Sequence, residues 1–108
     1  MAETTSELKG VIERFCEELR KMGIACERVL LFGSRAKGAA NEGSDIDLFV
    51  ISRDWARYNQ RERLEMLGVA AARLLEPIQA RGVTPEEIAT HQLTPLWEQV
   101  IKEQAIDV

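Results

Sequence analysis

The hydrophobic positions near the start of the chain repeat with a helical period. Between residues 6 and 22 they fall on one stripe of a helix, opposite a face rich in Glu, Lys and Arg. The stripe consists of Leu8, Val11, Ile12, Phe15, Leu19 and Met22. Gly23 follows directly and predicts the end of this helix. The stripe must then pack against another element.

Two short apolar runs predict strands. Residues 29–32 are wholly apolar, which is typical of a strand that is covered on both faces. Residues 46–51 predict a second strand. Between the two runs, Ser34 is expected to cap a short helix that begins at Arg35, and residues 38–43 are expected to form a loop.

A long helix is predicted after the second strand. Asp54 offers an N-cap, and the helix should run to about residue 75, where Pro77 excludes its continuation. The positions expected to face inward are Leu64, Leu67, Ala71, Leu74 and Leu75. Residues 78–81 predict a third strand.

The last third of the chain carries two helix starts that begin with Thr-Pro. Residues 84–87 form a capping box with proline at the first helical position. A second helix should begin at residues 94–95 and bury Leu96, Trp97, Val100 and Ile101. Residues 105–108 are expected to add an edge strand. The order α-β-α-β-α-β-α predicts one α/β (α+β) domain over residues 1–108, with a small mixed sheet flanked by helices.

Composition narrows the class of protein. The 14 basic and 18 acidic residues give a net charge of −4, which argues against direct DNA or RNA binding through phosphate neutralisation. No apolar run is long enough to span a membrane, and the N-terminus lacks the features of a signal peptide. Cys16 and Cys26 are too few for a disulfide framework. We therefore expect a cytoplasmic protein in which both are reduced and half-buried.

Several conspicuous side chains have a structural interpretation as well as a functional one. Arg53, Arg57 and Arg61 recur every fourth residue and should share one solvated helix face rather than a nucleotide or partner patch. Trp55 and Tyr58 could stack on a base, but packing is the preferred interpretation. His91 is expected in a loop, and Trp97 is expected in the core.

The turn at Gly33-Ser34 is a candidate anion site. A buried strand that leads into Gly-Ser and then a helix leaves N–H groups free, and glycine lets a phosphate approach the backbone. Taken alone, such a turn is more often only a strand end with a helix cap. A Walker A loop is excluded, because Gly38 is followed by Ala39 and Ala40 where Lys and Ser or Thr are required.

Asp45 and Asp47 are candidate metal ligands. Side chains alternate along a strand, so both carboxylates should project from one face, about 7 Å apart. Carboxylates suit Mg²⁺ or Mn²⁺ better than Zn²⁺, and Mg²⁺ usually completes its shell with substrate phosphates. Alone, this pair is more often a strand start or a solvated edge; with the glycine turn nearby, it favours a nucleotide site.

The spacing of these residues resembles a known signature. Gly33-Ser34, ten residues and then Asp45-x-Asp47 is similar to the motif of the nucleotidyltransferase superfamily, which includes DNA polymerase β and kanamycin nucleotidyltransferase. Length and layout resemble the minimal nucleotidyltransferase (MNT) domains of bacteria and archaea. The resemblance implies the nucleotidyltransferase fold.

The resemblance also implies a two-metal transfer reaction. Asp45 and Asp47 would be the catalytic residues and would hold Mg²⁺ (or Mn²⁺). The implied nucleotide-binding residues are Gly33, Ser34, Arg35 and Lys37. For the last two, a solvated loop is an equal alternative.

One position departs from the family pattern. The family usually carries a third carboxylate on the strand after the long helix, and residues 77–81 contain none. Gln79 should occupy or adjoin that place, and a neutral amide cannot accept a proton at pH 7. Glu76 could reach the site, but a surface position is expected for it. This departure therefore concerns catalysis more than nucleotide binding.

Three functional hypotheses follow. The resemblance implies an enzyme that transfers a nucleotide, AMP from ATP, to a hydroxyl of a partner protein, as the antitoxin-like half of an HEPN/MNT pair. The alternative is a binding module that neutralises an HEPN-type partner by docking alone. A polymerase fragment fits poorly, because no basic strip is present to hold a strand.

Overall fold

The computed structural model describes residues 5–33, 45–104 and 106–107. The helix expected at Arg35 with its Ser34 cap, and the loop expected over residues 38–43, lie outside this part. The elements are, in order, α1 (Thr5–Lys21), β1 (Arg28–Phe32), β2 (Ile46–Ile51), the 3₁₀ helix η1 (Arg53–Arg57), α2 (Gln60–Leu74), β3 (Ile78–Val83), α3 (Pro85–Ala89), α4 (Pro95–Gln99), the π-helical turn η2 (Val100–Gln104) and β4 (Ile106–Asp107).

The strands form one mixed sheet in the order β3-β2-β1-β4. β1 runs antiparallel to both β2 and β4, whereas β2 and β3 are parallel. This sheet with its helices confirms the predicted fold class, and β3 and β4 confirm the third strand and the edge strand. The register places Phe32 and Gln79 on either side of Asp47.

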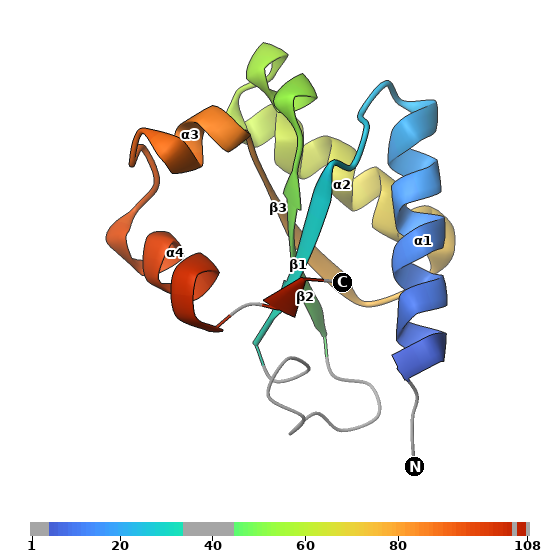
Figure 1. Ribbon diagram of the computed structural model, residues 1–108. Helices are drawn as coiled ribbons and strands as arrows, with labels where there is room; N and C mark the ends of the chain where they lie inside the picture. The colour runs from blue at the N-terminus through green and yellow to red at the C-terminus, as the bar shows by residue number, and fades with distance from the viewer. Residues whose placement is uncertain (1–4, 34–44, 105, 108) are drawn as a thin grey trace.

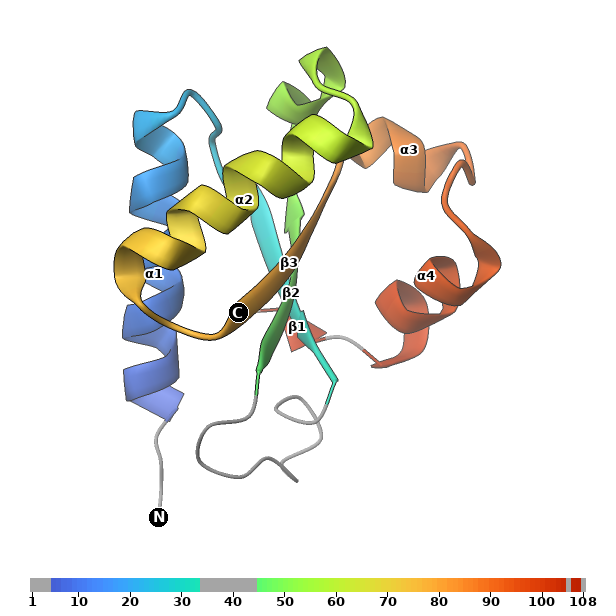
Figure 2. The same cartoon turned by 180° about the vertical axis from the view of Figure 1, so that it is seen from behind.

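The two faces of the sheet are covered differently. α1 and α2 lie together on one face, and α3, α4 and η2 lie on the other side (Figures 1 and 2). Under α1 and α2, the core contains fully buried side chains such as Phe15, Leu48 and Trp55. A smaller cluster on the opposite face contains Phe49 and Val83. The second face is the one that carries the candidate site.

The first helix confirms the prediction from periodicity. Ile12, Phe15 and Leu19 of its stripe are buried, and the other members pack against them. Gly23 has a φ of 92°, a conformation that glycine adopts without strain. The N–H of Gly23 donates to the Arg20 carbonyl at 3.0 Å, which helps end the helix.

The prediction that Asp54 caps the long helix is wrong. A separate 3₁₀ helix, η1, intervenes, and α2 begins after Asn59, which forms a capping box with Glu62. Asp54 instead accepts a hydrogen bond from the Ala25 N–H at 2.9 Å. The expected single arginine face is wrong for the same reason: residues 53 and 57 lie in η1, whereas residue 61 lies in α2. All three arginines are nevertheless exposed.

Two of the leucines expected to face inward on α2 do not. Leu64 is 45% exposed and Leu75 is 90% exposed. Leu75 is the C-cap, and its left-handed backbone (φ 57°) lies beyond the last helical residue. At the start of the helix, the inward position belongs to Arg63, which is only 4% exposed. Leu67 and Ala71 are buried as predicted.

The C-terminal helices follow the predicted caps. Thr84 and Glu87 form the expected capping box at α3, and the Thr94 side chain caps α4. Leu96, expected to be buried, is 67% exposed, because α4 covers the sheet through the next residue, Trp97. Trp97 is half-buried, so its predicted core position is correct only in part.

Other predictions from the sequence concern single side chains. Cys16 and Cys26 are free and half-buried, as expected. Trp55 is fully buried, which confirms packing, and His91 lies in the turn between α3 and α4. Within the part of the chain that the structure describes, no helix could cross a membrane.

Candidate active site

The candidate site begins where β2 enters the sheet. Asp45 directly precedes β2 and is exposed, and Asp47 is the second residue of the strand and half-buried. The intervening Ile46 is buried on the α1–α2 face of the sheet. Strand alternation therefore directs the two carboxylates to the opposite face, as expected from the sequence.

Gly33 lies against the Asp47 carboxylate. It follows the last residue of β1, which pairs with Asp47, and its φ is 76°. A Cβ at this position would overlap Oδ2 of Asp47 and lie only 3.2 Å from its Cγ. Both the backbone conformation and the close approach therefore require glycine. This is a structural reason for Gly33 that the sequence did not reveal.

Gln79 lies on β3 directly beside Asp47 of β2. It is the β3 partner of Asp47, and its Nε2 donates a hydrogen bond to Oδ2 of Asp45 at 2.7 Å. The position where the family pattern has a third carboxylate, or one next to it, thus presents an amide donor to Asp45. Glu76, the alternative, pairs with Arg14 of α1 at 4.0 Å, on the packed side of the sheet.

The carboxyl group of Asp47 is in an unfavourable electrostatic position. Partial burial and the neighbouring Asp45 carboxylate both raise the pKa of Asp47, and the nearby Arg81 guanidinium opposes this rise. Two carboxylates placed together in this way favour binding of a cation between them.

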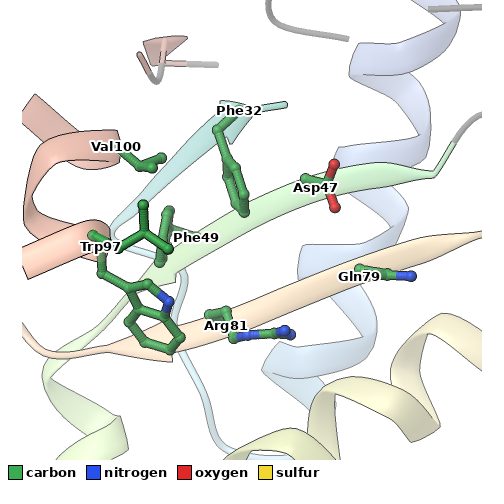
Figure 3. Close-up of a pocket in the computed structure, with 8 residues that line it drawn as sticks. Phe32, Asp47, Phe49, Gln79, Arg81, Trp97 and Val100 are labelled. Carbon is green, nitrogen blue, oxygen red and sulfur yellow. The ribbon is translucent and has the colours of Figure 1, made fainter. Parts of the chain in front are cut away.

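Arg81 and Trp97 are site residues that sequence reasoning missed. Arg81 lies two residues after Gln79 on β3, and its guanidinium carbon lies 5.9 Å from the Trp97 ring centroid. Both line a pocket of about 160 Å³ that Asp47 and Gln79 also line (Figure 3). The two-residue spacing from Gln79 to Arg81 was a usable signal. No sequence pattern brought Trp97 to that strand.

The structure brings together only part of the expected nucleotide site. Asp45, Asp47 and Gly33 lie at adjoining strand ends. Ser34, Arg35 and Lys37, the other expected nucleotide-binding residues, lie outside the described residues. Among the residues that are described, no three Asp, Glu, His or Cys side chains form a metal-binding group.

Comparison with known proteins assigns the family. The model of the nucleotidyltransferase domain matches residues 8–103, which include the whole candidate site. The chain belongs to the nucleotidyltransferase domain family. No curated protein is significantly similar to this nucleotidyltransferase over its sequence.

Solved structures share the fold of this nucleotidyltransferase. A crystal structure of a toxin–antitoxin with AMP-PNP matches with a TM-score of 0.60 and 22% identity, covering 88% of this chain and 69% of that one. A candidate nucleotidyltransferase from Sulfolobus solfataricus matches with a TM-score of 0.52 and 18% identity, covering 99% and 89%. At these identities the likeness concerns the fold.

Nucleotidyltransferase domains generally use divalent metal ions, and the donors present fit one such ion. Asp47, which lines the pocket, and the neighbouring Asp45 offer hard oxygen ligands, and phosphate oxygens could complete the shell. The Gln79 side chain turns an N–H toward Asp45, so it orients a ligand rather than adding a charge. Two carboxylates without a third suit a cation that arrives bound to nucleotide phosphates better than a cation held by protein groups alone.

Proposed function

We propose that this nucleotidyltransferase transfers AMP from ATP to a hydroxyl group of a partner protein, and that it is the antitoxin-like member of a pair with an HEPN-type protein. Mg²⁺ or Mn²⁺ would be held by Asp45 and Asp47. The observation that carries the proposal is the placement of these two carboxylates beside Gly33, within a chain of this family. The toxin–antitoxin structure with AMP-PNP supports both a nucleotide and a partner.

Each described residue has a separate task in this proposal. Asp45 and Asp47 hold the cation, and Gly33, which makes room for the Asp47 carboxylate, contacts a phosphate through its backbone. When bound, the cation would neutralise charge on the phosphates and stabilise the leaving pyrophosphate. Gln79 orients Asp45, and Arg81 adds positive charge on the side of Asp47. Gly33 thus combines a packing requirement with a proposed phosphate contact.

The transfer needs no reactant besides ATP and the acceptor hydroxyl. The acceptor oxygen attacks the α-phosphorus, the bond from that phosphorus to the bridging oxygen breaks, and pyrophosphate leaves. The proton of the hydroxyl must pass to another group, and the amide of Gln79 cannot accept it. In this proposal the proton leaves to water or to a group that the partner supplies.

Label transfer from α-³²P-ATP tests the reaction. The protein is incubated with Mg²⁺ or Mn²⁺ and the product of the adjacent gene, and the double variant Asp45→Asn/Asp47→Asn serves as the inactive form. A matched control, Glu65→Gln, removes an exposed carboxylate on α2 far from the site. Label on the partner that is lost only in the double variant supports the proposal. Equal label in all three proteins contradicts it.

A second candidate function is a module that binds nucleotide and partner without catalysis. The observation that favours it is the amide of Gln79 in place of a third carboxylate. Neutralisation of the partner by the Asp45→Ala variant separates the two functions. A module that acts by docking retains its effect in this variant, whereas an enzyme loses it.

A further inference from the structure

The face of the sheet that α4 and η2 cover has an aromatic pocket next to Asp47. Phe32 and Phe49 are stacked with ring centroids 4.6 Å apart, and Trp97 meets the Phe49 ring edge-on at 5.4 Å. Together with Arg81 and Val100 they line the space of about 160 Å³ whose remaining wall includes Asp47 (Figure 3). This space is far larger than one water molecule requires.

The chemistry of these walls suits a flat aromatic ring. Bases stack on aromatic side chains with little dependence on their identity, and Trp97 is half-buried, so part of its surface remains accessible. The Arg81 guanidinium is also flat, and within the described residues its hydrogen bonding is to the neighbouring Ala80 carbonyl, at 3.2 Å. A guanidinium has further N–H donors that can meet the acceptor atoms of a base.

The position of the pocket relates the ring to the phosphates. Asp47 and Phe49 are two residues apart on one face of β2, which corresponds to about 7 Å. In a nucleoside triphosphate, the ribose separates the base from the α-phosphate. A base against the accessible part of Trp97, whose ring meets Phe49, would therefore leave its phosphates near Asp47.

We propose that this pocket binds the nucleobase of the nucleotide substrate, with Trp97 as the stacking surface and Arg81 as the hydrogen-bond donor. The inference rests on the proposed function and adds to it the group that recognises the base. If the inference is correct, a nucleoside triphosphate binds more tightly than an inorganic phosphate chain of equal charge.

Intrinsic fluorescence of the unmodified protein, with Trp97→Phe as the reference, provides a direct test. Trp97 is half-buried in the pocket, whereas Trp55 is fully buried with its indole N–H bonded to the Val50 carbonyl. Subtracting the spectrum of Trp97→Phe removes the Trp55 signal. With Mg²⁺ present, AMP-PNP should quench Trp97, and inorganic tripolyphosphate should bind without quenching it. An equal response to both ligands would overturn the inference.

Substitution of Trp97 gives the second measurement. Trp97→Leu should weaken AMP-PNP binding about tenfold in calorimetry and leave tripolyphosphate binding unchanged, because one stacking contact is lost. Trp97→Phe keeps a ring and should retain most of the affinity. Thermal unfolding checks that both variants fold. If Trp97→Leu does not fold, the fluorescence comparison, which needs only the unmodified protein and Trp97→Phe, still decides.

Two failures are distinguishable. If AMP-PNP binds equally well to the unmodified protein and to Trp97→Leu, the base lies elsewhere and this inference is wrong, while the proposed function stands. If neither AMP-PNP nor tripolyphosphate binds with Mg²⁺ or Mn²⁺, the proposed nucleotide site itself is wrong.

Discussion

Arg63 and Arg81 each lie near one carboxylate, but their surroundings differ. Arg63 is 4% exposed and donates to the carbonyls of Trp55, Tyr58 and Gly82 and to both carboxylate oxygens of Glu87, the last two at 3.0 Å. Arg81 is half-buried beside Asp47, and its hydrogen bond among the described residues is to Ala80.

This difference separates a structural charge from one that a ligand can use. Arg63 ties η1, α2, β3 and α3 together, and the protein itself provides its partners. A buried guanidinium is tolerated only under that condition. Arg81 faces a pocket. Beside it, burial and the Asp45 carboxylate raise the pKa of Asp47, and a bound cation would offset this rise. The first region should therefore govern stability and the second should govern ligand binding.

Asp47→Asn gives the largest expected effect and should affect function alone. Loss of this ligand removes charge stabilisation of several kcal/mol, so nucleotide transfer should fall about 10³-fold or more. Stability should not fall, because the substitution removes a carboxylate that burial and Asp45 disfavour. Label transfer and thermal unfolding on the same preparation measure the two effects. A large loss of stability would contradict this separation of roles.

Glu87→Ala should give the opposite result. It leaves the Arg63 guanidinium buried without its carboxylate, which costs about 3–5 kcal/mol of unfolding free energy. Glu86→Ala is the matched control, because Glu86 is the exposed neighbour in the same first turn of α3, and it should change stability by less than about 0.5 kcal/mol. Denaturant unfolding measures both. Similar values for the two variants would refute a structural role for the pair.

The sequence predicted the carboxylates of the second region but the arginine of neither region. Alternation along the strand placed Asp45 and Asp47 on one face, and the family resemblance placed Gln79 near them, where the structure pairs it with Asp47. Arg63 could not be predicted, because a basic residue on an amphipathic helix is normally solvated. Its burial depends on carbonyls from η1 and β3, which are distant in the sequence. Local capping signals worked at Thr84 for the converse reason, since all their partners lie within three residues.

Gly82→Ala sharpens the comparison within β3, where residues 81 and 82 are neighbours with different roles. A Cβ on Gly82 would lie 2.7 Å from Cε2 of Trp55, a fully buried ring that cannot move freely. Overpacking of this kind costs about 1–3 kcal/mol. The control is Gly10→Ala in α1, where a Cβ meets nothing within 4 Å. Thermal unfolding should show a lower Tm for Gly82→Ala only, and an unchanged Tm would mean that the ring can shift.

The smallest expected effect is the acid dependence of the Arg63–Glu87 pair. Burial raises the pKa of Glu87, but hydrogen bonds from Arg63 and Thr84 outweigh it and hold that pKa below the ordinary value of 4.5. The folded state therefore binds the proton of Glu87 less readily than the unfolded state does. Its contribution to stability is complete above the unfolded pKa and is lost as pH falls through that value toward the folded one.

Glu87→Gln isolates this contribution, because a neutral amide does not titrate. Unfolding free energies measured between pH 6 and pH 3 (about 1.5 units on either side of the ordinary pKa of glutamate) should fall less steeply for Glu87→Gln than for the unmodified protein. Glu86→Gln should follow the unmodified curve, since Glu86 is exposed. Parallel curves for Glu87→Gln and the unmodified protein would assign the acid dependence to other carboxylates. The ion pair at Arg63 would then matter for its geometry and hydrogen bonds rather than for its charge.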